Sequence, residues 1–276
     1  MKVRSPPENI WASKRDPQTA LRFLETFEDD ATRLGEGAAR AGSTVTEREV
    51  LSAAWYHTIE LPGGIVTRGM FDHRHVVDHY GIPDDLSGKR CLDVACSDGF
   101  WSFEFERRGA EVTAVDVASP SDYDLPTGSV TSAAGRERRL NAFSLAHRAL
   151  GSHVKRLPMN LYALDPADLG TFDLVHSGDV LLHLERPLEA LRRYRDMTSA
   201  DGTALITDSF DPDLEGNVTR YFGGFEGLLW WMPSLDCLVQ MVYDAGFGAA
   251  EVVSIFNLPA WDQDEGYWRA VIKATL

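Results

Sequence analysis

The chain has little cysteine and few positive charges for its size. Its 276 residues include three cysteines, Cys91, Cys96 and Cys237, whose spacing fits no metal site, and we expect them to be reduced. Lysine and arginine total 27 against 42 aspartates and glutamates, a formal net charge of −15. Because nucleic-acid-binding proteins use cationic side chains to neutralise phosphates, this balance argues against a large RNA or DNA footprint, although it leaves room for a local basic patch.

Long hydrophobic runs are also missing. No apolar segment reaches the length of about 20 residues that a membrane-spanning helix needs. The polar start, residues 1–7, is followed by no apolar core of a signal peptide. We therefore expect a soluble, cytoplasmic protein without a membrane partner. The length favours one α/β domain with a terminal extension over two full domains.

Residues 90–117 are the most informative part of the chain. An apolar run at 91–95 that contains Asp93 is typical of a strand buried on both faces. A turn of small residues follows, and then a helix at 100–108 and a second strand at 111–117. This order of strand, tight turn, helix and strand predicts a ligand pocket at the end of the first strand.

The turn has small side chains at alternate positions, Ala95, Ser97 and Gly99, so a ligand can approach the backbone there. Asp116 ends the second strand, about 20 residues after Asp93, where a carboxylate can accept hydrogen bonds from both hydroxyls of a ribose. The Gly-x-Gly-x-x-Gly pattern that brings a helix N-terminus to a pyrophosphate is absent. The segment therefore favours a nucleoside ligand without a pyrophosphate.

Strands and helices alternate through the rest of the chain, which indicates a parallel sheet with helices on both faces. The later strands are expected at 154–159, 172–177, 203–209, 251–256 and 267–275. The helices between them are expected at 136–150, from Pro187 onward, and from Leu235 to about Gly246.

Two segments lie outside this alternation. Residues 1–54 contain an apolar stripe at helical spacing, at positions 20–34, and we interpret them as a helical cap over the pocket of the main domain, 55–276. Residues 208–233 are rich in aromatic side chains and are too long for an ordinary connection. We interpret this second segment as a lid on the substrate side of the pocket.

Four motifs carry a family resemblance: WYHTIEL at 55–61, DVACSDGFW at 93–101, LHLERPLE at 182–189 and WMPS at 231–234. Together they resemble the tRNA wobble-uridine methyl- and carboxymethyltransferases and their relatives, from about Trp55 to the C-terminus. The spacing of Ala95, Ser97 and Gly99 behind Asp93 is similar to the first motif of class I methyltransferases. The resemblance implies a Rossmann-like, seven-stranded, mostly parallel α/β sheet that binds S-adenosyl-L-methionine.

The same resemblance implies which residues hold the cofactor. The turn at 95–99 would border its methionine part, Asp116 its ribose, and Leu161 and Tyr162 its adenine. The full predicted set is Asp93, Ala95, Cys96, Ser97, Gly99, Trp101, Asp116, Val117, Leu161, Tyr162 and Ser177.

The donor is expected to be S-adenosylmethionine rather than carboxy-S-adenosylmethionine. Relatives that use the carboxylated donor hold its extra carboxylate partly with a tyrosine and an arginine. This chain has Leu182 at the tyrosine position and keeps the arginine as Arg269. A buried carboxylate without its charged partners is costly, so the plain donor is favoured.

Methyl transfer to a hydroxyl or phenol needs a base, whereas transfer to an amine or thiolate needs none. Catalytic candidates are His57, Asp179, His183 and Asp208; for each, a packing or hydrogen-bonding role in the fold is the alternative. Candidates for substrate binding are Tyr56, Tyr221, Trp230, Trp231 and Arg269. No metal site is predicted.

The leading hypothesis is a methyltransferase that acts on a small-molecule acceptor in natural product biosynthesis. A tRNA wobble-uridine modifying enzyme is the first alternative. A cofactor-binding regulatory protein without turnover is the second, and a nicotinamide oxidoreductase comes last because the phosphate-binding glycines are missing. The sequence leaves the oligomeric state open, with a homodimer as one option.

Overall fold

The structure is a computed structural model that describes residues 44–119, 122–126, 133–223, 228–261 and 266–276. The apolar stripe at 20–34 lies outside these residues, so its interpretation as part of a helical cap stays a prediction. Within the described part of the chain, no helix combines the length and apolar character that a membrane crossing requires.

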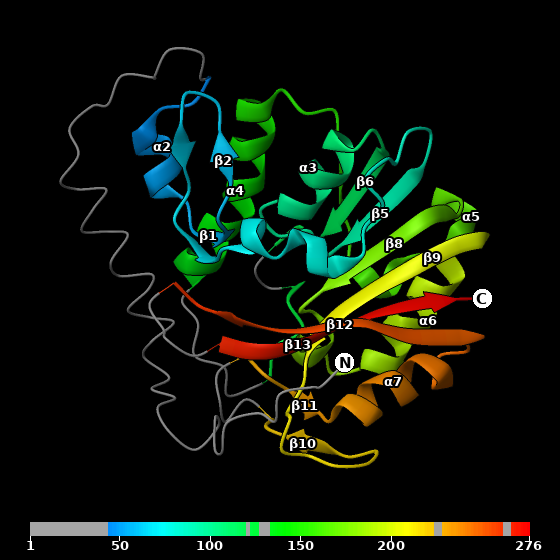
Figure 1. Ribbon diagram of the computed structural model, residues 1–276. Coiled ribbons are helices and arrows are strands. Elements are labelled where there is room, and N and C mark those ends of the chain that lie inside the picture. Colours follow the sequence, from blue (N-terminus) through cyan, green and yellow to red (C-terminus); the bar gives the residue numbers. More distant parts are fainter. Residues whose placement is uncertain (1–43, 120–121, 127–132, 224–227, 262–265) are drawn as a thin grey trace.

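A seven-stranded sheet with the order β12-β13-β9-β8-β5-β6-β7 forms the centre (Figure 1). β13 runs antiparallel between β9 and β12, and the remaining neighbours are parallel. This arrangement confirms the predicted fold class, and all seven predicted strands are present. The strands are β5 (Arg90–Val94), β6 (Glu111–Asp116), β7 (Lys155–Pro158), β8 (Phe172–Gly178), β9 (Thr198–Ser209), β12 (Ala249–Pro259) and β13 (Gly266–Thr275).

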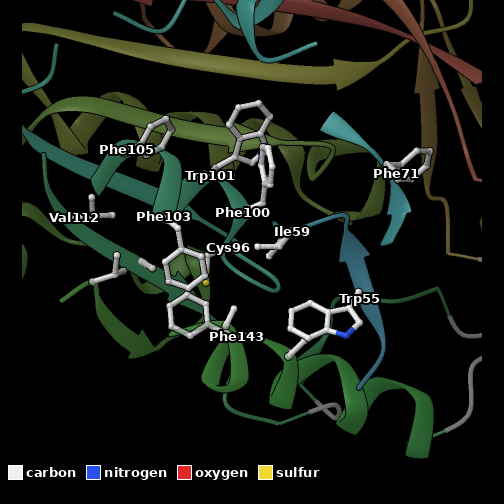
Figure 2. Packing of buried hydrophobic residues seen from close by; sticks show 14 of the residues in the cluster. Trp55, Ile59, Phe71, Cys96, Phe100, Trp101, Phe103, Phe105, Val112 and Phe143 are labelled. Atoms are coloured by element: carbon white, nitrogen blue, oxygen red, sulfur yellow. The ribbon is translucent and has the colours of Figure 1, made fainter. Parts of the chain in front are cut away.

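Helices cover both faces of the sheet. α3 (Phe100–Arg107) and α4 (Ala133–Leu150) lie on one face, and α5 (Pro166–Leu169), α6 (Pro187–Met197) and α7 (Leu235–Asp244) on the other (Figure 1). Neighbouring strand residues point to opposite faces, so Cys91 packs in one hydrophobic cluster and Leu92 in the other. Figure 2 shows the first cluster, in which the rings of Phe103 and Phe143 join α3 to α4 with centroids 5.2 Å apart.

The segment before the sheet folds against α4 and α3. α2 (Glu47–Ser52) begins at a capping box between Thr46 and Glu49, and Glu49 pairs with Arg148 of α4 at 2.6 Å. From the sequence we expect a strand-like piece with a tight turn at 55–67 and a helix at 71–80. The structure has four short strands between residues 55 and 71, and two 3₁₀ turns in place of the expected helix. These elements are β1 (Trp55–His57), β2 (Glu60–Leu61), β3 (Ile65–Val66), β4 (Gly69–Phe71), η1 (His73–His75) and η2 (Val77–Tyr80).

The predicted lid contains an antiparallel hairpin, β10 (Thr219–Tyr221) and β11 (Trp231–Pro233). It contacts the short turn η5 (Leu181–His183) through a hydrogen bond from the Trp230 backbone N–H to the Leu182 carbonyl at 2.9 Å. A similar turn, η4 (Leu161–Ala163), follows β7. Both turns lie beyond the carboxyl ends of parallel strands, where ligands bind in open α/β sheets.

Candidate functional site

The turn after β5 has a left-handed backbone at every second residue. The φ angles are 56° at Ala95, 51° at Ser97 and 89° at Gly99, the three positions that the sequence singles out. A left-handed conformation costs a non-glycine residue roughly 1–2 kcal/mol, so two of the three positions are strained. Such strain is concentrated at functional sites, where the surrounding structure enforces it.

Asp116 at the end of β6 enforces part of this turn. Its Oδ2 accepts a hydrogen bond from the Ser97 N–H at 2.8 Å, and its Oδ1 accepts one from the Val117 N–H at 2.8 Å. Burial raises the pKa of this carboxyl, and the two backbone donors oppose the rise. The carboxyl borders a cavity of about 170 Å³ that Leu161 and Tyr162 also line.

Two histidines in the cavity lining, His57 and His176, are oriented by aspartates. The Nδ1 of His57 contacts Asp98, a fully buried carboxylate that also accepts the backbone N–H groups of Tyr56 at 2.8 Å and His57 at 2.7 Å. The Nδ1 of His176 lies 2.9 Å from Oδ1 of Asp93. In both pairs the carboxylate fixes the orientation of the ring.

An ion pair lies behind the end of β8. Asp179, with a φ of 52°, lines the cavity and contacts Nε of Arg269 at 2.7 Å. Its carboxylate also accepts hydrogen bonds from the Tyr56 hydroxyl at 3.3 Å and the Ser209 hydroxyl at 3.1 Å. Burial disfavours the charge of Arg269, but the adjacent Asp179 outweighs that effect and raises the pKa of the guanidinium.

Asp124 links the cavity lining to the predicted lid. Its carboxylate accepts hydrogen bonds from the Tyr162 hydroxyl at 2.6 Å and the Glu185 N–H at 2.8 Å, and its carbonyl accepts one from Nε1 of Trp230 at 2.8 Å. On the same side, Nδ1 of His183 donates to the carbonyl of Leu228, another lining residue, at 3.0 Å. The aromatic segment therefore borders the cavity.

The cavity is acidic. Its lining among the described residues contains no lysine and no arginine. Three histidines, His57, His176 and His183, are the remaining groups that could carry a positive charge. The carboxylates in the lining are Asp93, Asp116, Asp122, Asp124 and Asp179.

Most of the predicted site residues meet at this cavity. Of the cofactor candidates, nine line it; of the catalytic candidates, three; and of the substrate candidates, one. These residues are Asp93, Ala95, Cys96, Ser97, Trp101, Asp116, Val117, Leu161 and Tyr162, then His57, Asp179 and His183, and finally Tyr56.

Gly99 and Ser177 lie outside the lining. A Cβ at Gly99 would come within 2.6 Å of Phe103 and 2.8 Å of Phe143, so this glycine gives room to aromatic packing and to the left-handed backbone. Ser177 follows His176 in β8 and points to the other face of the sheet, where its hydroxyl donates to the Tyr194 hydroxyl at 3.2 Å. Neither residue is brought to the cavity.

Five further candidates also lie outside it. Asp208 is buried and accepts the Leu181 N–H at 2.7 Å; burial and the charge of Asp179 raise its pKa to about 8. Arg269 lies behind Asp179, and Trp230 anchors the lid to Asp124. Trp231 and Asp208 line a second cavity, of about 510 Å³, between α6, α7 and the hairpin, while Tyr221 is 62% exposed.

The sequence did not single out several lining residues. Gly178 comes from β8, Met159 and Asn160 follow β7, and residues 122–125 follow β6. Their common signal is their place at or just after the carboxyl end of a parallel strand. Among the described residues, no group of three histidine, cysteine or carboxylate side chains could hold a metal ion.

Comparison with known proteins agrees with this geometry. A family described as a methyltransferase domain matches residues 70–252. A tRNA U34 carboxymethyltransferase from Saccharophagus degradans is 24% identical over 188 residues, which cover 66% of this chain and 52% of that protein. A magnesium-protoporphyrin O-methyltransferase from Rhodobacter capsulatus is 48% identical over 44 residues, 16% of this chain and 19% of that protein.

Two solved structures share the fold. The N-terminal domain of EvdMO1 with SAH bound aligns with a TM-score of 0.53 and 15% identity, over 91% of this chain and 96% of that one. An S-adenosylmethionine dependent methyltransferase from Mesorhizobium loti aligns with a TM-score of 0.50 and 14% identity, over 73% and 97%. The chain spans about half the length of the curated tRNA-modifying relatives that it matches.

The family match covers more than half of the chain and includes both strands that form the turn and the Asp116 site. The strand order, with an antiparallel β13 inserted beside β9, is that of class I S-adenosylmethionine-dependent methyltransferases. The chain therefore belongs to the methyltransferase-domain family and has its class I fold.

Proposed function

We propose that this chain binds S-adenosylmethionine in the cavity and methylates a small-molecule acceptor. The residues fit the nucleoside: both oxygens of Asp116 face backbone donors and keep lone pairs for a ribose diol, and Leu161 and Tyr162 offer apolar surface to a base. The cofactor supplies a methyl group already activated on a sulfonium. The protein's part is then to orient the acceptor and to exclude water.

The acidic lining favours S-adenosylmethionine over carboxy-S-adenosylmethionine as the donor. Arg269, the arginine that could meet an extra carboxylate, is already paired with Asp179 of this chain at 2.7 Å. A donor carboxylate placed there would meet Asp179, without a lysine or arginine in the described lining to compensate. The unmodified, positively charged donor therefore suits this cavity better than carboxy-S-adenosylmethionine.

The negative charge of the lining also restricts which acceptors can bind. An acceptor that carries phosphates or carboxylates would be repelled by five aspartates, so we infer a neutral or cationic small molecule. When the acceptor is a hydroxyl or phenol, His57 is placed to take its proton because Asp98 holds the Nδ1 side of its ring. Asp98 is then a positioning residue for His57.

A tRNA acceptor is the second candidate, because curated relatives that align over 66% and 61% of this chain are named tRNA U34 carboxymethyltransferases. The net charge of −15 and the acidic cavity count against it. The two candidates make opposite predictions about salt and polyanions, which one assay can separate.

The test measures S-adenosylhomocysteine released from S-adenosylmethionine by purified protein. Neutral phenols, sugar hydroxyls and amines are offered in one arm and unmodified total tRNA in the other, at low salt. We expect turnover with a member of the first arm, no turnover with tRNA, and no tRNA mobility shift. Turnover with tRNA alone would contradict the small-molecule proposal. Tight cofactor binding without product in either arm would instead indicate a regulatory protein.

A matched variant pair tests the donor choice. Asp179→Asn frees the charge of Arg269, and we expect it to reduce the preference for S-adenosylmethionine over carboxy-S-adenosylmethionine. Asp122→Asn, which removes a lining charge without an Arg269 contact, is the control and should leave the preference unchanged. Equal discrimination by the wild type and Asp179→Asn would show that the ion pair does not select the donor.

A further inference from the structure

The second cavity lies apart from the cavity at Asp116. It has a volume of about 510 Å³ and lies between α6, α7 and the β10–β11 hairpin, on the face of the sheet that carries the second hydrophobic cluster. Among the described residues, the two linings have none in common. The turn η5 contributes Leu181 and Leu182 to the second cavity and His183 to the first. A volume of this size is typical of small-molecule sites.

The lining of the second cavity is mostly apolar. Trp231 contributes an aromatic ring, which is held by a hydrogen bond from its Nε1 to the Leu184 carbonyl at 2.9 Å. Aliphatic side chains from η5, α6 and α7, among them Leu188, Leu238 and Met241, form much of the remaining wall. Because removal of apolar surface from water stabilises a complex by about 25 cal/mol per Å², this lining favours an apolar ligand.

The charged side chains of the lining balance one another. Glu185, Glu189, Arg186 and Arg192 contribute two charges of each sign, and Arg186 pairs with Glu189 at 2.6 Å. Glu185, Arg186 and Arg192 are exposed, so these charges stay in contact with water. A charged ligand would give up its hydration without meeting a net opposite charge, and the cavity therefore favours a neutral one.

Asp208 places one carboxyl group in this apolar lining. It is 1% exposed and shares a face of β9 with Ile206, a member of the second cluster. Each of its oxygens accepts one backbone N–H, from Leu181 at 2.7 Å and from Ser209 at 2.8 Å, and each keeps a further position for a hydrogen bond. Burial and the charge of Asp179 raise the pKa of Asp208 to about 8. At neutral pH the carboxyl group therefore bears a proton that it can donate to a ligand oxygen.

We propose that the second cavity binds a neutral, largely apolar small molecule whose carbonyl or ether oxygen accepts a hydrogen bond from the Asp208 carboxyl group. The apolar walls supply the affinity, and the single buried carboxyl group fixes the orientation of the ligand. This site is separate from the proposed methyl transfer and does not depend on it.

The neighbours of Asp208 leave it as the expected source of a pH dependence. Asp179, paired with Arg269, lies on its cofactor-cavity side, and the four charges of the lining lie on α6 or just before it. Tyr194 of α6 and Cys237 of α7 also lie near it. Burial raises the pKa of both, so both stay mostly neutral up to about pH 9.

Two probes of similar size test the carboxyl group. In calorimetric titrations we expect 2-acetylnaphthalene to bind about three- to tenfold more weakly at pH 9 than at pH 7, because only the protonated carboxyl group donates to its ketone. The affinity of 2-ethylnaphthalene, which has no oxygen, should change by less than about twofold. Asp208→Asn, whose amide donates at both pH values, should bind the ketone equally well at both.

Cys237 reports where the probes bind. It lines the second cavity and is partly exposed, whereas Cys91 and Cys96 are buried. Saturating 2-acetylnaphthalene should therefore slow the alkylation of Cys237 by N-ethylmaleimide, measured by mass spectrometry. Cys237→Trp, which fills the cavity, should weaken both probes by more than about tenfold. Cys237→Ser is the matched control and should preserve binding.

Several results would overturn the inference. Equal pH responses of the two probes would show that Asp208 does not hold the ketone. Unchanged alkylation of Cys237, binding retained by Cys237→Trp, or displacement of the probe by S-adenosylhomocysteine would place the probe elsewhere. Folded wild-type protein that binds neither probe would refute the site itself. None of these results bears on methyl transfer, which is measured separately by release of S-adenosylhomocysteine.

Discussion

Ala95 and Ser97 hold a backbone conformation that glycine adopts without strain. Both have a left-handed φ, and both border the cavity. The sequence pattern located this turn because small side chains alternate there, but it could not show that two non-glycine residues adopt left-handed angles. The hydrogen bond from the Ser97 N–H to Asp116 is one of the contacts that hold the strained backbone.

Ala95→Gly should therefore stabilise the fold. Relief of the left-handed alanine is worth roughly 1–2 kcal/mol and the added freedom of the unfolded chain costs about 0.5–1, so we expect the free energy of unfolding to rise by about 0.5–1 kcal/mol. Urea denaturation measures it. Ala110→Gly, at a position without a positive φ, is the control and should lower stability. A similar loss in both variants would show that residue 95 is not strained.

Asp208 should make the free energy of unfolding depend on pH in a predictable direction. Burial and the charge of Asp179 raise its pKa to about 8 in the folded state, whereas an unfolded aspartate titrates near ~4. Between these values the folded state binds the extra proton, so the free energy of unfolding should fall as pH rises from about 4 to about 8. Urea unfolding across this range should show a shallower slope for Asp208→Asn than for the wild type. Identical slopes would assign the pH dependence to other groups.

The sequence could not predict which side chains of a buried strand point into the cavity. Ser177 and His176 are neighbours in one strand, and only His176 faces the cavity. Strand alternation predicts that two neighbours differ in facing, but not which one faces the ligand, because both faces of this sheet are buried. The ion pair between Asp179 and Arg269 joins positions 90 residues apart, and such pairing comes only from the fold.

At the scale of elements, the start of α7 joins the helix to the lid. The Ser234 hydroxyl accepts the Cys237 N–H at 3.0 Å and donates to the Gly216 carbonyl at 2.5 Å, and the Ser234 N–H donates to the Val218 carbonyl at 2.9 Å. One buried serine thus caps a helix and fixes the base of the β10–β11 hairpin.

Ser234→Ala should lower the free energy of unfolding by about 1–2 kcal/mol, because it removes an N-cap and leaves a buried carbonyl with a lost donor. Thermal or urea denaturation gives the value. Ser52→Ala, an exposed serine at the end of α2, serves as the control and should change stability by less than about 0.5 kcal/mol. Equal effects would mean that the Ser234 cap contributes little.

Elements with strong sequence signals were predicted well. Proline marked the start of α6, glycines marked the ends of several helices, and apolar runs marked the strands. Weak signals misled the prediction at 71–80, where two 3₁₀ turns replace the expected helix. This segment packs His73 and Tyr80 into the core, so tertiary contacts with the sheet outweigh its local preference.

At the scale of the whole molecule, the strand order places the site. β5 lies between β6 and β8 at the topological switch point of the sheet: β6 and β7 follow on one side of β5, and β8 and β9 on the other. Residues from the ends of β5, β6 and β8 meet at the cavity. The alternation of strands and helices was sufficient to predict a parallel sheet with helices on both faces, whereas the order of the strands comes only from the fold. It was not sufficient to predict the charge of the cavity, because the acidic residues that line it come from separate parts of the chain.

Calorimetric titration of S-adenosylhomocysteine into nucleoside-free protein directly tests the proposal that Asp116 holds the nucleoside in the cavity. We expect saturable binding at one site per chain and a loss of affinity of at least about tenfold in Asp116→Asn, since its carboxylate would accept hydrogen bonds from the ribose hydroxyls. Absence of binding by the folded wild-type protein, or unchanged affinity in the variant, would contradict it.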